Sequence, residues 1–211
     1  MHRVLIVDDG GNFRDSMARI IQDHLALTVV AAARSMDEAL ELAQTTHPGL
    51  IILDLRIPKH LHEPAESRYG IATLHALHAL PQPAKIVLWS YLPAGPWLRA
   101  IESLIEGYIG KDQDTYVIVE LIRSVLSGGK AYTPTQREML AHVDIHITPR
   151  EAEVLQLVVK GRKDEEIAES LSIASGTARR YVEILRDKFG VRTRGELGFL
   201  AQRKGYLPPE I

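Results

Sequence analysis

Five short apolar segments alternate with amphipathic segments in the first half of the chain, and this alternation restricts the fold more than any other feature. The apolar segments lie at 4–7, 28–32, 50–53, 85–89 and 107–110. Between them, apolar residues recur at spacings of three and four, as on one face of a helix. The runs are continuous rather than alternating, which is typical of parallel strands buried on both faces. We therefore predict an α/β fold with a doubly wound, five-stranded parallel sheet.

Helices are predicted between these strands, most clearly over 71–80, 97–106 and 115–127. After Gly128-Gly129 no further strand-like run occurs, and apolar residues keep helical spacing to the end of the chain. A short helix is expected near 134–142. The predicted parts are a first domain over 1–127, a linker over 128–146 and a small all-α domain over 147–211.

Composition limits the environment in which the chain works. The 211 residues suffice for two small domains, and none is cysteine, so disulfides and thiolate metal sites are excluded. The first apolar run has only four residues before Asp8-Asp9, too short for a signal peptide. No stretch approaches the ~18–20 apolar residues of a membrane span. We expect a cytoplasmic protein that does not interact with membranes.

The two halves of the chain carry charges of opposite sign. The net charge is −2 overall, but residues 127–211 hold 14 Lys and Arg against 12 Asp and Glu, a net +2. Residues 1–126 hold 11 against 15, a net −4. This asymmetry favours an acidic domain joined to a domain that binds nucleic acid.

Polar residues follow four of the predicted strands. Asp8 and Asp9 follow the first strand, Asp54 the third, Ser90 the fourth and Lys111 the fifth. Ligands of open parallel sheets bind at the carboxyl ends of the strands, so these side chains are expected to meet. Three carboxylates suit a hard cation such as Mg²⁺, and an aspartate can act as a nucleophile that forms an acyl phosphate. A single such acid would be a solvated turn residue, but the whole set favours a site.

Three motifs in this half resemble those of CheY-like receiver domains. They are Val-Asp-Asp at 7–9, Asp-Leu-Arg-Ile-Pro at 54–58 and Gly-Tyr-Ile-Gly-Lys at 107–111. The resemblance covers the first ~127 residues and implies phosphorylation of the chain by a sensor histidine kinase.

The resemblance also implies roles for individual residues. Asp54 would accept the phosphoryl group. Asp8, Asp9, Asp54 and the backbone carbonyl of Arg56 would hold Mg²⁺. Lys111 would contact the phosphate, and Tyr108 would change rotamer on activation.

Two features depart from the receiver pattern. Receivers usually carry Thr or Ser at the end of the fourth strand, whereas counting back from Lys111 without gaps places Trp89 there and Ser90 one residue later. A one-residue deletion in the fourth helix would restore Ser90. The second departure is an apparent insertion of eight residues within 59–69, before Gly70. We expect a solvated surface loop rather than a metal or regulatory site.

The predicted all-α domain has well-marked helix starts. Thr148, Pro149 and Glu151 form a capping box with proline in the first turn. Asp164 and Ser175 are predicted to cap the next two helices. The third of these helices, over about 176–189, follows a short second helix and a tight turn. This order is typical of a helix-turn-helix that inserts its last helix into the major groove of DNA, although an ordinary helical bundle would show a similar pattern.

The individual residues favour the DNA-binding interpretation. Six basic residues and two acids lie between 175 and 194. The sequence resembles LuxR/NarL-type DNA-binding domains through Thr-Pro-Arg-Glu at 148–151, Glu-Ile-Ala at 166–168, Ser-Gly-Thr at 175–177 and Gly-Val at 190–191. The expected DNA-facing residues are Arg179, Arg180, Glu183, Ile184 and Lys188. By the same resemblance, the last helix pairs two domains through Leu197, Leu200 and Ala201.

We therefore predict a DNA-binding response regulator, phosphorylated on Asp54, that controls transcription and forms a homodimer when active. An alternative is a phosphorylation-independent receiver that serves as the dimerisation module of a constitutive DNA-binding regulator, and Trp89 is the feature that favours it. A phosphatase-like enzyme is disfavoured, because such enzymes carry a second acid two residues beyond the nucleophile and Arg56 stands there. We expect no enzymatic activity.

Overall fold

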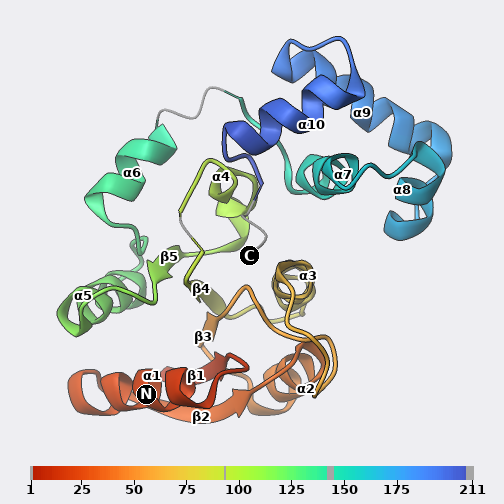
Figure 1. Ribbon diagram of the computed structural model, residues 1–211. Coiled ribbons are helices and arrows are strands. Elements are labelled where there is room, and N and C mark those ends of the chain that lie inside the picture. The colour runs from red at the N-terminus through yellow and green to blue at the C-terminus, as the bar shows by residue number, and fades with distance from the viewer. Residues whose placement is uncertain (1, 93, 142–144, 208–211) are drawn as a thin grey trace. The chain divides into compact units, whose positions relative to one another are not determined.

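The computed structural model describes residues 2–92, 94–141 and 145–207 (Figure 1). These residues fall into two compact units. The first unit comprises Met1–Pro93 and Ser103–Thr133, and the second comprises Ala94–Glu102 and Pro134–Ile211. The segment Ala94–Glu102, which we expected in the first domain, therefore groups with the second unit.

The first unit contains the predicted five-stranded parallel sheet, in the order β2-β1-β3-β4-β5. The strands are β1 (His2–Val7), β2 (Leu27–Ala33), β3 (Leu50–Leu53), β4 (Lys85–Ser90) and β5 (Gly107–Gly110). Branched and other apolar side chains fill β1 and β3, where the described ones are buried from Val4 to Val7 and from Leu50 to Leu53. The predicted fold class is confirmed.

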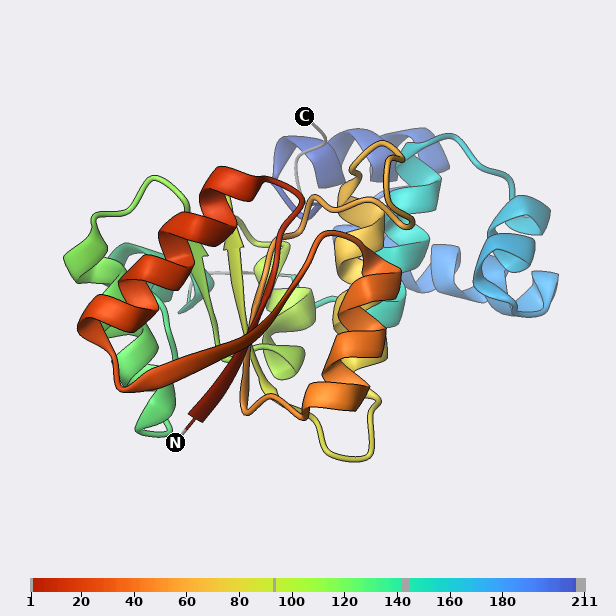
Figure 2. The same cartoon turned by 90° about the horizontal axis from the view of Figure 1, so that it is seen from below.

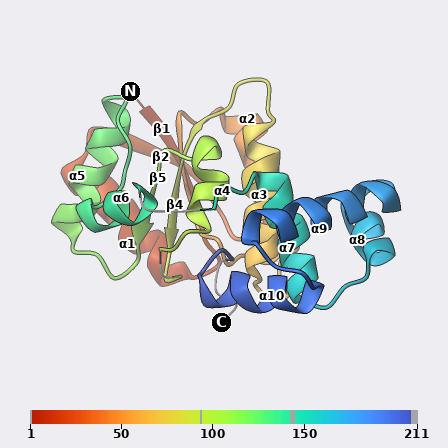
Figure 3. The same ribbon diagram turned by 90° about the horizontal axis from the view of Figure 1, so that it is seen from above.

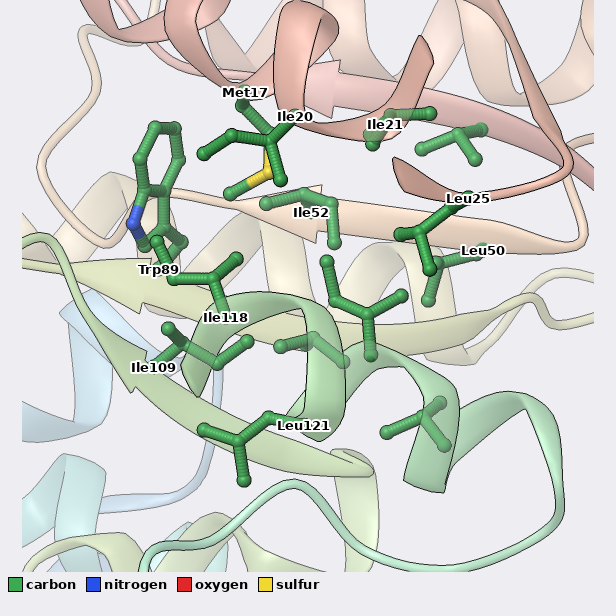
Figure 4. Close-up of a cluster of buried hydrophobic side chains, with 14 of the residues drawn as sticks. Met17, Ile20, Ile21, Leu25, Leu50, Ile52, Trp89, Ile109, Ile118 and Leu121 are labelled. Atoms are coloured by element: carbon green, nitrogen blue, oxygen red, sulfur yellow. The ribbon is translucent and has the colours of Figure 1, made fainter. Parts of the chain in front are cut away.

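Helices cover both faces of this sheet (Figures 2 and 3). On one face, α1 (Gly11–His24) and α5 (Thr115–Leu126) enclose an apolar core together with alternate residues of the strands. Figure 4 shows this core, with Met17 and Ile20 of α1 and Ile118 and Leu121 of α5 packed over Ile52 and Ile109. On the other face lie α2 (Met36–Thr46) and α3 (Ser67–His78), which contact each other.

Two helices differ from the sequence-based expectation. The helix α3 begins at Ser67 rather than at 71, so the last part of the inserted segment forms its first turn. The expected helix over 97–106 is reduced to α4 (Leu98–Ile101) and a 3-10 turn over Glu102–Leu104. The start differs by one residue only, and the loss is at the far end, where the 3-10 turn replaces regular helix.

The first unit also extends further than predicted. Ala131, expected in the linker, forms a parallel bridge with Gly107. Its N–H donates to the Glu106 carbonyl at 2.7 Å, and its carbonyl accepts from the Tyr108 N–H at 2.8 Å. A Cβ on Gly107 would lie 2.2 Å from the Ala131 carbonyl oxygen, so glycine is needed for this approach. Part of the segment expected as linker thus pairs with β5 at the edge of the sheet.

The second unit contains a helical bundle with its own core. Its further helices are α6 (Pro134–Ala141), α7 (Pro149–Val159), α8 (Asp164–Leu171), α9 (Ser175–Phe189) and α10 (Arg194–Arg203). The predicted capping box at Thr148 and Glu151 is confirmed. The predicted caps at Asp164 and Ser175 are wrong, because each is the first residue of its helix. Among the helices described in both units, none combines the length and apolar character needed to cross a membrane.

The Gly70 backbone packs directly against the residue that follows Asp54. A Cβ on Gly70 would lie 2.0 Å from the Leu55 carbonyl oxygen and 2.6 Å from its Cα. We expect Gly70→Ala to lower the free energy of unfolding by about 1–3 kcal/mol, because backbone must move to relieve the overlap. Urea unfolding followed by circular dichroism measures this. Gly11→Ala is the control, since its Cβ would meet only the end of the Arg14 side chain, at 3.7 Å; equal effects of the two variants would contradict the prediction.

Candidate functional site

An acidic pocket lies at the carboxyl ends of β1 and β3. The N–H of Asp8 donates to Ala33 and that of Asp54 donates to Val7, so both residues continue the sheet just beyond their strands. Asp8 and Asp54 are buried and Asp9 is exposed. One carboxylate oxygen of each of the three residues lies within 4.8 Å of the others. The structure thus brings together the three acids that the sequence placed at strand ends.

Lys111 inserts its ammonium group between two of these acids. Its Nζ lies 2.6 Å from Asp8 Oδ2 and 2.7 Å from Asp54 Oδ2, and its side chain is only 3% exposed. Burial lowers the pKa of Lys111, but attraction and hydrogen bonds from Asp54 and Asp8 outweigh it, so the pKa lies above its ordinary value. Burial, aided by the Asp54 charge, keeps the pKa of Asp8 above its ordinary value although Lys111 lowers it. The pocket therefore holds a fixed cation beside the Asp54 carboxylate.

The pocket has the donor set of a divalent cation site. Three carboxylates face one ammonium group, which leaves an excess of negative charge, and every potential ligand atom is oxygen. Hard cations prefer such oxygen ligands. Arg56 lies beside the acids, because its backbone N–H donates to Asp54 Oδ1 at 3.2 Å. The residues present therefore fit Mg²⁺.

The register of β4 separates Trp89 from Ser90. Leu88 pairs with Tyr108 and Trp89 with Ile109, so successive side chains point to opposite faces of the sheet. Trp89 packs into the core beneath α1 and α5 (Figure 4). Ser90 lies on the face of Leu88 and Tyr108, is buried, and accepts the Leu92 N–H at 3.4 Å. Ser90 rather than Trp89 therefore shares a face with Tyr108, and its role as the switch hydroxyl stays a prediction.

Tyr108 is fully buried on β5. Its hydroxyl donates to the Leu92 carbonyl and lies 3.3 Å from the Ser90 carbonyl. Burial raises the pKa of its hydroxyl, and the Asp54 charge raises it further. The residue expected to switch rotamer is thus linked through backbone to the end of β4.

The inserted segment 59–69 lies on the surface and is anchored at both ends. The Met36 N–H donates to the Pro58 carbonyl at 2.9 Å, and the His60 imidazole pairs with the Asp37 carboxylate at the start of α2. At its far end, the Glu66 N–H donates to the Ile57 carbonyl at 3.1 Å. Residues 59–64 are exposed, and the described residues form no metal-binding group there.

In the second unit, α8 and α9 form the two helices of a helix-turn-helix. Ala178, Val182, Leu185 and Phe189 of α9 are buried. On its outer side Arg179, Arg180 and Glu183 are exposed and Ile184 is half-buried. The Arg179 side chain is 74% exposed, and its Nε lies 3.8 Å from Asp164 Oδ2. These four predicted DNA-facing residues share one surface.

Lys188, the fifth predicted DNA-facing residue, is already engaged inside the unit. Its Nζ lies 2.7 Å from Glu151 Oε2 and 2.9 Å from the His146 carbonyl oxygen. Its side chain is 34% exposed, whereas that of Glu151 is 7% exposed. This pair ties α9 to the start of α7, which the sequence analysis missed because it assigned Glu151 only to the capping box.

A second ion pair, also not predicted from the sequence, fixes the start of α8. Arg194 Nη1 lies 2.5 Å from Asp164 Oδ1. Asp164 was expected to cap its own helix, but its carboxylate instead holds the first residue of α10. No local pattern identifies such a partner, since 30 residues separate the two.

Two of the three predicted dimerisation residues are buried. Leu197 and Ala201 are fully buried in the core of the second unit, and Leu200 packs against it partly buried. Leu197 and Ala201 thus serve the core of their own unit, and pairing of two domains through α10 stays a prediction. The exposed apolar residue of α10 is Phe199, at 65%. Helical spacing identified the apolar face of α10 but not that this face points into its own core.

A doubly wound sheet with this acidic pocket, joined to a helix-turn-helix unit, defines the class of two-component response regulators. The chain matches the response regulator receiver domain over residues 4–123 and the luxR family of bacterial regulatory proteins over residues 146–201. It belongs to the response regulator receiver family and is a DNA-binding response regulator of the LuxR family.

Relatives from two bacteria match the chain over nearly its whole length. The chain is 28% identical to the transcriptional regulatory protein DesR of Bacillus subtilis, over 98% of this chain and 100% of DesR. It is also 28% identical to the nitrate/nitrite response regulator protein NarP of Escherichia coli, over 95% of each. RcsB of Salmonella enterica serovar Typhimurium, solved bound to the promoter rprA with the phosphomimetic BeF3-, has the same fold, with a TM-score of 0.70 at 19% identity over 96% of this chain and 99% of RcsB.

The Glu151–Lys188 pair makes stability depend on pH. Burial raises the pKa of Glu151, but bonds from Lys188 and the Thr148 N–H outweigh it and lower the pKa below its ordinary 4.5. The stabilisation is therefore complete above pH 4.5 and is lost as the pH falls through the lower folded-state pKa. We expect Glu151→Gln to cost about 1–2 kcal/mol at pH 7 and less in acid.

Urea unfolding of the full chain between pH 7 and pH 3 measures this difference. Glu169→Gln, an exposed position on α8, is the matched control. A Glu151→Gln deficit that stays constant across the pH range would contradict the prediction.

Proposed function

We propose that Asp54 accepts a phosphoryl group from a sensor histidine kinase and that this modification controls DNA binding by the helix-turn-helix. The observation that carries the proposal is the buried Lys111 ammonium, held 2.7 Å from Asp54 and 2.6 Å from Asp8. A cation fixed beside a carboxylate nucleophile can bind a phosphoryl oxygen as negative charge gathers there.

Each residue of the pocket has a defined task in this reaction. An oxygen of Asp54 forms a bond to phosphorus, while the bond from phosphorus to the donor breaks and the donor keeps the electron pair. Lys111 then exchanges its contact with Asp54 for a phosphoryl oxygen. Asp8, Asp9, Asp54 and the Arg56 carbonyl would hold Mg²⁺, which neutralises charge on the incoming group when bound.

Ser90 and Tyr108 connect the pocket to the rest of the first unit. We assign to the Ser90 hydroxyl the role of following the phosphoryl group, because Ser90 lies on the Tyr108 face of β4 whereas Trp89 is part of the core. The Tyr108 hydroxyl contacts the backbone carbonyls of Ser90 and Leu92. A shift of this backbone would therefore move the Tyr108 ring. This placement of Ser90 and Trp89 supports control by phosphorylation over the phosphorylation-independent alternative.

The second unit supplies the output. Arg179 and Arg180 suit phosphates or guanine edges, and Ile184 suits a thymine methyl group. Dimers fit this role, because paired helix-turn-helix domains bind paired half-sites. A solved structure with the same fold, 20% identical with a TM-score of 0.61, shows two RcsB dimers bound to two parallel DNAs. Under this proposal the protein is a cytoplasmic transcription regulator rather than an enzyme, and it is a homodimer when active.

Phosphorylation can be tested by mass spectrometry of the intact protein. With Mg²⁺ and acetyl phosphate, we expect the wild type to gain one phosphoryl group and Asp54→Asn to gain none. Light scattering after size-exclusion chromatography should show a larger dimer fraction for the phosphorylated sample. Absence of the mass gain in the wild type, with unchanged DNA binding, would refute control by phosphorylation.

DNA contacts can be tested through their salt dependence. We expect Arg179→Ala and Arg180→Ala each to weaken binding and to reduce the slope of log K against log salt by about one if a phosphate contact is lost. Fluorescence anisotropy with a duplex selected from random sequence measures both quantities. Arg19→Ala, an exposed arginine on α1, is the control. A control slope that falls as far as those of the α9 variants would contradict the assignment.

A further inference from the structure

Three aromatic rings lie within 5.8 Å of the Lys111 ammonium group. Its Nζ lies 4.5 Å from the ring centroid of Phe13, 5.4 Å from that of Trp89 and 5.8 Å from that of Tyr91. A cation over ring faces at these distances is attracted by their electron density, most strongly where water is excluded. We call Phe13, Trp89 and Tyr91 the aromatic clamp.

The rings of the clamp hold one another in place. Phe13 meets Trp89 edge to face, with centroids 6.1 Å apart and planes at 86°. It meets Tyr91 in the same manner, at 5.3 Å and 81°. The three residues come from α1, from β4 and from the residue that follows β4, so the clamp joins two elements across the pocket.

The chain leaves room for this arrangement at Gly10. A Cβ on Gly10 would lie 2.9 Å from the Phe13 ring and 3.2 Å from Asp8 Oδ1. The Gly10 N–H donates to Asp8 Oδ1 at 2.8 Å. Phe13 therefore packs against the same turn that orients Asp8, and the clamp is part of the pocket's construction.

Tyr91 is the member of the clamp that the core does not require. Its side chain is 58% exposed, whereas Trp89 is buried and Phe13 packs against the core. An exposed ring is held here by Phe13 and by the Lys111 charge. Removing the Tyr91 ring would therefore open one wall of the clamp and leave the core intact.

Phosphoryl transfer requires Lys111 to change partners without leaving the pocket. In the unmodified protein its ammonium binds Asp8 and Asp54, and in the modified protein it would bind a phosphoryl oxygen. The face of an aromatic ring attracts a cation without a directional hydrogen bond, so the ammonium can shift while its attraction to the rings persists.

We propose that the aromatic clamp positions Lys111 for phosphoryl transfer to Asp54, with Phe13 and Tyr91 as positioning residues. This inference rests on the proposed function. In the reaction tested, an Asp54 oxygen bonds to phosphorus as the phosphorus–oxygen bond to acetate breaks, and acetate leaves with the electron pair.

The test compares Tyr91→Leu, which removes the ring, with Tyr91→Phe, which keeps it. Phosphorylation of the full chain by acetyl phosphate at saturating Mg²⁺ is followed over a range of donor concentrations. We expect Tyr91→Leu to lower the maximal rate constant by about two- to tenfold, with little change in the donor concentration that gives half the maximal rate. Tyr91→Phe should retain the wild-type rate constant within about twofold.

Tyr116→Leu is the matched control, because Tyr116 is an exposed tyrosine on α5 outside the clamp. Thermal unfolding of all variants separates a folding defect from a positioning defect. A Tyr91→Leu rate constant equal to or above that of the wild type would overturn the proposal. So would an equal loss in Tyr91→Phe, which would assign the effect to the hydroxyl group.

The two proposals fail in different ways. If the wild type itself gains no phosphoryl group, the proposed function fails and the clamp loses its assigned role with it. If the wild type is phosphorylated and the Tyr91→Leu variant behaves identically, only the clamp is refuted.

Discussion

The first unit depends on a buried ammonium group shared by two carboxylates from different strands. Lys111 follows β5, Asp8 follows β1 and Asp54 follows β3, so the contact exists only when all three strands lie in register. Burying these charges is costly unless each is paired, and here two acids share one cation with three rings around it. In the proposed function, this costly arrangement is also what would make Asp54 reactive toward a phosphoryl group.

In the second unit, ion pairs fix the helices relative to one another. In the proposed function, the outer side of α9 contacts DNA while its inner side packs into the core of the unit. Lys188 binds Glu151 at the start of α7, and Arg194 binds Asp164 at the start of α8. Charged residues thus hold the helices from the ends, and Arg179 and Arg180 stay exposed on the surface between them.

The sequence predicted some features far better than others. Strand positions were predicted closely because continuous apolar runs have few other uses in a soluble chain, as β3 at Leu50–Leu53 illustrates. The length of α4 and the caps at Asp164 and Ser175 were not predicted correctly. A four-residue helix carries too little periodicity to measure, and Asp164 has a distant partner that no local pattern indicates. The sequence also could not place Leu197 and Ala201, because an apolar helix face fits a core and a dimer interface equally well.

The sequence by itself determined the fold class, the division into an α/β part and a helical part, and the set of acids at the strand ends. These follow from periodicity and strand order, which are local or topological. Only the tertiary structure decided that Ser90 rather than Trp89 shares a face with Tyr108, because strand register depends on the length of an irregular connection. Tertiary structure also decided that Lys188 binds Glu151 and that three rings enclose Lys111, since such contacts join residues that are distant in sequence.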